Sequence, residues 1–181
     1  EKETGDSIQV FVKEKYYKPL GLSTLSFQPL KKYPIDRIVP TENDLQFRKQ
    51  LLHGDVHDPG AAMMGGIAGH AGLFSNANDL AILMQMLLNN GEYGGKRYLK
   101  KETIKEFTRQ QFPETANRRG LGFDKAEPDQ SKNGPTCKSA SEETFGHTGF
   151  TGTCVWVDPK YDLIYIFLSN RVHPDAENDK L

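Results

Sequence analysis

The stretch Thr153-Cys154-Val155-Trp156-Val157, followed five residues later by Leu163-Ile164-Tyr165-Ile166-Phe167-Leu168, decides the fold of this chain. The linker, residues 158–162, is too short for a crossover between parallel strands, so the two runs predict an antiparallel hairpin. An antiparallel sheet with one wet face alternates apolar and polar residues, and these runs do not alternate. We therefore expect an α/β (α+β) fold in which helices cover both faces of an antiparallel sheet.

Several helices are predicted upstream of this hairpin. The most regular pattern follows the cap Asn76 and ends at Asn90-Gly91, with a stripe of leucine and methionine on one face. A weaker pattern covers residues 101–110, and a first helix begins at Asp6 or Ser7. A short helix is also expected over residues 42–52.

The chain divides into three parts by composition. Residues 1–112 are mainly helical and loop, residues 113–143 form a polar loop, and residues 144–181 carry the hairpin and a tail. With a net charge of −1, the chain lacks the excess of positive charge that is typical of nucleic-acid-binding proteins. No apolar run in the sequence is long enough to span a membrane. The first residues contain no apolar signal region, and a predicted helix follows almost at once. We interpret this as a sequence that starts within a longer chain.

A glycine-rich motif, Phe145-Gly146-His147-Thr148-Gly149-Phe150-Thr151-Gly152, leads directly into the hairpin. It resembles the third active-site motif of the penicillin-recognising serine hydrolases, the family of class C β-lactamases, D,D-peptidases and related esterases. The resemblance implies catalytic roles for four residues and a substrate contact for Thr151. His147 is the basic member and Thr148 the hydroxyl. Gly149 lets substrate approach the backbone, and the Phe150 amide donates into an oxyanion hole.

The resemblance extends upstream to residues 40–42, 54–58, 66–75 and 76–90, and downstream to the tail at 170–174. In the family, the glycine-rich central segment lies close to the active-site cleft. The resemblance therefore implies that His57, Asp58 and His70 bind substrate. Hydrogen bonds within the loops are the alternative role for each of them.

The nucleophile motif of the family, Ser-x-x-Lys, does not occur in these 181 residues, and neither does Tyr-x-Asn. Serine needs a neighbouring base to become an effective nucleophile. We therefore interpret residues 1–181 as the C-terminal portion of one β-lactamase/transpeptidase-like domain, incomplete and inactive by itself. Its partner would be the remaining N-terminal part of the same domain.

In the complete protein, the resemblance implies hydrolysis of an ester or amide bond through an acyl-enzyme. The substrate would be a β-lactam, a peptide or a carboxylester, and no cofactor is implied. Resemblance to exported bacterial enzymes implies a periplasmic or cell-surface location.

Two other functions stay open. Histidine and aspartate are dense between His53 and His70, and this cluster could hold zinc in a metal-dependent hydrolase. The order of these residues does not match a known metallo-β-lactamase pattern, and we expect no metal. The chain could also be a non-catalytic module of the same fold that binds a ligand in the cleft.

Overall fold

The computed structural model describes residues 1–178 and divides into two compact units. Unit 1 comprises Glu1–Asp79, Phe150–Gly152 and the described residues from Leu168 onward, and unit 2 comprises Leu80–Gly149 and Thr153–Phe167. Both units are assembled from segments that are distant in sequence. The division into three parts by composition stays a prediction.

Unit 1 consists of short elements and small sheets. A first helical segment, α1 (Ile8–Val12), continues into a π-helical turn, η1 (Lys13–Tyr17). The remaining elements are β1 (Ser26–Phe27), η2 (Pro29–Lys31), η3 (Ile35–Arg37), β2 (Pro40–Asp44), β3 (Gln50–His53), α2 (Pro59–Met63) and β4 (Leu73–Phe74). Strand β1 pairs with β4, and β2 pairs with β3, both antiparallel. A small buried cluster of Val56, Ala61 and Ala68 lies at α2.

The expectation of a helix over residues 42–52 is wrong, because this segment is the β2–β3 hairpin. The carboxylate of Asp44 accepts hydrogen bonds from the amides of Gln46, Phe47 and Arg48 at 3.1, 2.8 and 2.9 Å. These bonds fold the chain into a tight turn, which Lys49 completes with a left-handed φ of 52°. A side chain that satisfies the local amides thus competes successfully with the helix.

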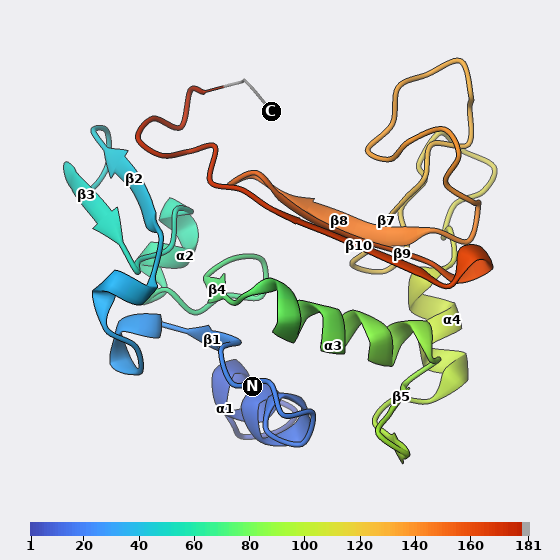
Figure 1. Ribbon diagram of the computed structural model, residues 1–181, viewed down its shortest axis with the longest axis horizontal. Helices are drawn as coiled ribbons and strands as arrows, with labels where there is room; N and C mark the ends of the chain where they lie inside the picture. The colour runs from blue at the N-terminus through green and yellow to red at the C-terminus, as the bar shows by residue number, and fades with distance from the viewer. Residues whose placement is uncertain (179–181) are drawn as a thin grey trace. The chain divides into compact units, whose positions relative to one another are not determined.

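Unit 2 contains the sheet that the C-terminal runs predict. Its strands are β7 (Asp124–Lys125), β8 (Phe145–Gly149), β9 (Thr153–Asp158) and β10 (Leu163–Leu168), of which only the last residue, Leu168, is assigned to unit 1. They lie in the order β10-β9-β8-β7 (Figure 1). β8 pairs antiparallel with both β7 and β9, and the turn η4 (Pro159–Tyr161) connects β9 to β10. The mixed α/β fold with an antiparallel sheet is therefore confirmed.

The predicted helices after the glycine-rich segment are confirmed as α3 (Ala77–Leu88) and α4 (Lys101–Thr108). The Asn76 side chain accepts from the Asp79 amide at 2.9 Å, as expected of a cap. Two short strands, β5 (Glu92–Tyr93) and β6 (Lys96–Arg97), lie between the helices. No helix among residues 1–178 is long and apolar enough to cross a membrane.

Strand β10 keeps much of its apolar surface exposed. Leu163, Tyr165 and Phe167 are 54%, 53% and 41% exposed, whereas Trp156 and Val157 on β9 are buried. β10 is also an edge strand of the sheet. The described residues do not supply the helical cover that we expect over both faces of this strand, so that cover stays a prediction.

Candidate active site

The His147-Thr148-Gly149 triplet forms the last three residues of β8, and all three are exposed. On one side the triplet pairs with β9, with His147 opposite Val155 and Gly149 opposite Thr153. On the other side the ladder to β7 ends at the pair of Asp124 and Gly146. Within residues 1–178, the outer edge of the triplet therefore has no paired strand, and its backbone is accessible to an extended ligand.

His147 has a defined tautomer because of its two contacts. Arg119 Nη1 lies 2.7 Å from His147 Nε2, and His147 Nδ1 lies 2.6 Å from the carbonyl oxygen of Thr148. A guanidinium has only donors, so Nε2 accepts; a carbonyl has only lone pairs, so Nδ1 donates. These contacts match the imidazole tautomer with its proton on Nδ1, next to the guanidinium of Arg119.

Arg119 is held near His147 by a buried carboxylate. Its Nη2 lies 3.6 Å from Asp124, which is 2% exposed and also accepts from Arg118 Nη2 at 2.9 Å. Burial raises the pKa of Asp124, but the bonds from Arg118 and the Lys125 amide outweigh it and hold that pKa below its ordinary value. Arg119 was not predicted from the sequence, because 28 residues and a polar loop separate it from His147.

The segment Phe150–Gly152 belongs to unit 1 by its contacts. Its carbonyl oxygens are all bonded to the tail. Arg171 Nε donates to Phe150 at 2.7 Å, the Arg171 amide donates to Thr151 at 3.0 Å, and the Ser169 hydroxyl donates to Gly152. The described residues provide no hydrogen-bond acceptor for the Phe150 amide. The carbonyls are thus fixed while this amide stays available for a ligand.

Gly152 is required at its position. Its φ is +94°, in the left-handed region, and an added Cβ would lie 2.5 Å from the Ser169 hydroxyl oxygen and 3.2 Å from Arg171. Any side chain at residue 152 would therefore push the segment away from the tail that bonds it.

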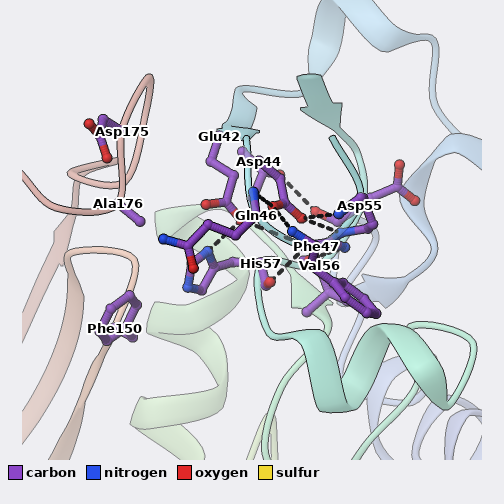
Figure 2. Close-up of polar contacts among 12 residues, drawn as sticks. Glu42, Asp44, Gln46, Phe47, Asp55, Val56, His57, Phe150, Asp175 and Ala176 are labelled. Carbon is purple, nitrogen blue, oxygen red and sulfur yellow. Dashed lines mark hydrogen bonds and ion pairs between the residues drawn. The ribbon is translucent and has the colours of Figure 1, made fainter. Parts of the chain in front are cut away.

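His57 lies beside this segment and is brought together with Phe150, as Figure 2 shows. The two rings stack with centroids 4.9 Å apart and planes 14° apart. His57 Nδ1 lies 2.6 Å from Oε1 of Glu42, a carboxylate that is 6% exposed. Arg48 bonds the carbonyl of His57 at 2.8 Å and Asp44 at 3.0 Å. His57 is thus fixed through its ring and its backbone.

Asp58 and His70 are also in contact, at 3.1 Å between Asp58 Oδ1 and His70 Nε2. Asp58 is the N-cap of α2 and accepts from the Ala61 amide at 2.7 Å. The Ala61 amide and the His70 side chain lower the pKa of Asp58. These contacts are the loop hydrogen bonds that we gave as the alternative to substrate binding.

The histidine and aspartate residues between His53 and His70 do not converge on one point. His53 Nε2 lies 2.5 Å from the Ile38 carbonyl oxygen, whereas His57 and His70 have separate carboxylate partners. Among residues 1–178, no group of three or more histidine, cysteine, aspartate or glutamate side chains is placed to hold a metal ion. The histidines of this cluster thus each have a separate partner within the described residues.

Comparison with known proteins identifies the family. The family model described as Beta-lactamase matches residues 1–181. A protein of Escherichia coli K12 named "Putative D-alanyl-D-alanine carboxypeptidase" is 37% identical over 99% of this chain and 44% of its own length. A protein of the same name from Salmonella gallinarum is 38% identical over 94% of this chain and 42% of its own length. The chain thus spans less than half the length of these curated relatives.

Solved structures agree in fold. A β-lactamase from Mycobacterium bovis superimposes with a TM-score of 0.59 at 24% identity, over 98% of this chain and 54% of the other. A penicillin-binding protein homologue from Caulobacter crescentus gives a TM-score of 0.59 at 21% identity, over 92% of this chain and 47% of the other. With the family model covering every residue, the chain belongs to the beta-lactamase family of penicillin-recognising serine hydrolases.

Proposed function

We propose that residues 1–181 are the C-terminal part of a hydrolase that cleaves ester or amide bonds through a serine acyl-enzyme. The observation that carries this proposal is the exposed, unpaired edge of β8 at His147, Thr148 and Gly149, with the Arg119 guanidinium beside it. An extended peptide or a β-lactam can bond the backbone of such an edge. A fixed positive charge next to it attracts a substrate carboxylate.

The proposed reaction assigns each residue a simple task. A serine outside residues 1–181 attacks the carbonyl carbon of the substrate, and its proton passes to a neighbouring base. The Phe150 amide, which has no acceptor within residues 1–178, donates to the oxygen that gains negative charge. The leaving group departs with a proton, and water then hydrolyses the acyl-enzyme. The exposed Thr148 hydroxyl and Arg119 bind the substrate on the β8 edge.

The partner of this chain is then the rest of the same hydrolase domain. The exposed apolar residues of edge strand β10 support this, because a sheet edge that presents apolar side chains to water tends to associate with another element. A periplasmic or cell-surface location is part of the proposal, and the relatives named as D-alanyl-D-alanine carboxypeptidases suggest a cell-envelope enzyme.

Among possible substrates, we favour peptides that end in D-alanine over simple esters. The names of the E. coli and Salmonella relatives indicate this class, and the terminal carboxylate of such a peptide suits the charge of Arg119. The second candidate is a non-catalytic module that binds the same ligands in the cleft. It is favoured by the absence of Ser-x-x-Lys from residues 1–181.

The proposal is tested by labelling with a fluorescent penicillin, followed by peptide mass spectrometry. We use two samples: residues 1–181 alone, and the protein extended upstream to the length of the E. coli relative. The extended protein is expected to be acylated on the serine of a Ser-x-x-Lys outside this chain, and to release D-alanine from an acylated D-alanyl-D-alanine peptide. Residues 1–181 alone are expected to remain unlabelled.

A label on one of the serines within residues 1–181 would overturn the assignment of the nucleophile. Saturable binding of the penicillin to the extended protein without covalent labelling or product release would instead establish the binding module. Loss of activity on chelation, restored by zinc, would establish the metal-dependent alternative.

A further inference from the structure

The Phe150 side chain is held by two residues that lie far from it in the sequence. The His57 ring stacks on the Phe150 ring at 4.9 Å between centroids. The Arg171 guanidinium carbon lies 4.3 Å from the same centroid, and its Nε donates to the Phe150 carbonyl. Phe150 is nevertheless 62% exposed, so it is not fixed by burial in a core. Its orientation depends on these two contacts.

His57 is itself held by hydrogen bonds to its ring and to its backbone carbonyl. Its ring nitrogen Nδ1 lies 2.6 Å from Oε1 of the buried Glu42 side chain, a hydrogen-bonding distance. Glu42 is in turn 3.7 Å from Arg48, whose Nη1 and Nη2 donate to the carbonyls of Val56 and His57 at 2.6 and 2.8 Å. Figure 2 shows Glu42 and His57 facing each other. A buried charged network thus sets the plane of one imidazole ring.

We propose that the Glu42–His57 pair is a positioning device for Phe150, which aims the Phe150 amide at the reacting carbonyl oxygen. The pair acts through the stack and does not touch substrate, so both are positioning residues. The inference rests on the proposed function, since the Phe150 amide matters in this way only if acyl transfer takes place. A misplacement of about 1 Å in such a donor costs about a hundredfold in rate.

The carbonyl bonds and the ring stack restrain different parts of this segment. Arg171 and Ser169 bond the carbonyl oxygens of Phe150, Thr151 and Gly152. None of these bonds is made to the Phe150 amide. The His57 ring stacked on the Phe150 side chain adds a restraint on the residue that carries this amide, because a turn of that residue would separate the two rings.

The test uses the extended protein that includes residues 1–181, with two variants and a control. His57→Gln removes the stacking ring and keeps a donor. The double variant His57→Phe with Glu42→Gln keeps a ring at residue 57 and removes the charged pair without leaving a buried carboxylate unpaired. His53→Gln is the control, since His53 contacts the Ile38 carbonyl and not Phe150.

Two measurements are made on each protein. The first is penicillin acylation, separated into the binding constant and the acylation rate constant. The second is the Phe150 amide resonance in ¹⁵N-phenylalanine-labelled protein, assigned by its loss in Phe150→Leu. His57→Gln is expected to lower the rate constant about tenfold to a hundredfold with little change in binding, and to shift or broaden the Phe150 amide. The double variant keeps a ring but loses the pair that orients it, so it is expected to recover only part of the rate and of the resonance. His53→Gln is expected to behave as wild type.

The outcomes separate the two proposals. If wild type is not acylated, the proposed function fails, while the amide resonance still reports whether His57 orders Phe150. If wild type is acylated and His57→Gln leaves both the rate constant and the resonance unchanged, the positioning role is overturned. It is also overturned if His57→Gln and the double variant are equally impaired, because the ring at residue 57 would then be irrelevant.

Discussion

At the scale of single residues, the structure adds the positive charge of Arg119 beside β8. Arg119 Nη1 lies 2.7 Å from His147 Nε2, and His147 Nδ1 lies 2.6 Å from the carbonyl oxygen of its neighbour, contacts that match the Nδ1–H tautomer. A sequence motif alone assigns the basic character to the histidine. The structure adds a second basic residue, Arg119, which lies 28 positions upstream in the sequence.

Substitution of Arg119 tests this division of roles. We expect Arg119→Gln to lower acylation by penicillin, whose carboxylate is charged, about tenfold to a hundredfold, because a charge-assisted hydrogen bond is worth about 1.5–3 kcal/mol. Hydrolysis of a neutral p-nitrophenyl ester should change much less. ¹⁵N spectra of the His147 ring should show the Nδ1–H tautomer in wild type and a mixture of tautomers in the variant.

Arg109→Gln is the matched control, because Arg109 is an exposed arginine whose ion-pair partner is Glu106. It should leave both kinetic values and the His147 tautomer unchanged. Equal losses for the charged and neutral reagents in Arg119→Gln would contradict the role of its charge, and an unchanged tautomer would contradict the contact to His147.

At the scale of elements, β8 and β9 approach each other so closely that only glycine fits at residue 146. A Cβ there would lie 2.0 Å from the Val155 carbonyl oxygen and 2.9 Å from Trp156 Cα, both backbone atoms that cannot move away cheaply. We expect Gly146→Ala to destabilise unit 2 by roughly 3 kcal/mol. Urea unfolding followed by the fluorescence of Trp156, the single tryptophan of the chain, measures this.

Gly69→Ala serves as the control for that measurement. The φ angle of Gly69 lies outside the left-handed region, and an added Cβ would have no atom within 4 Å. Its effect should stay within about 0.5 kcal/mol. If both variants unfold at the urea midpoint of wild type, the close β8–β9 approach is not a constraint on the sequence.

Elements were predictable from the sequence where one local pattern decides them. The apolar stripe of α3 and the two apolar runs of β9 and β10 each suffice alone. The β2–β3 hairpin was not predictable, because the Asp44 side chain captures three amides that a helix would use. The partners of the site residues, Glu42 for His57 and Arg119 for His147, were missed because contacts over 15 and 28 residues leave no periodic signal.

At the scale of the whole molecule, buried carboxylates tie each unit together by accepting hydrogen bonds. In unit 1, the amides of Phe47 and Arg48 lower the pKa of Asp44. In unit 2, burial raises the pKa of Asp158, but bonds from Ser141 and Thr144 outweigh it and lower that pKa. Both units therefore depend on carboxylates that must stay ionised.

The sign of the resulting pH dependence follows from these directions. The folded-state pKa values lie below the ordinary 3.8, so the unfolded chain takes up protons first as the pH falls. The stabilisation is complete above about pH 5 and is lost as the pH falls through 3.8 towards the folded values. We expect hydrogen exchange, read by mass spectrometry on peptides from each unit, to accelerate in both units between about pH 5 and 2.5 after correction for the intrinsic rate.

Asp158→Asn should change the pH dependence of unit 2 without changing that of unit 1. The amide cannot ionise, so unit 2 of this variant should be less stable at neutral pH and should lose less additional stability between pH 5 and 2.5, while unit 1 keeps the wild-type dependence. Asp162→Asn, a change at an exposed aspartate of unit 2, should leave both dependences unchanged. If Asp158→Asn alters the pH dependence of exchange in both units alike, the two units unfold in acid as one cooperative body. If it alters the pH dependence of neither unit, Asp158 is not the carboxylate that fixes residues 141–144 to β9.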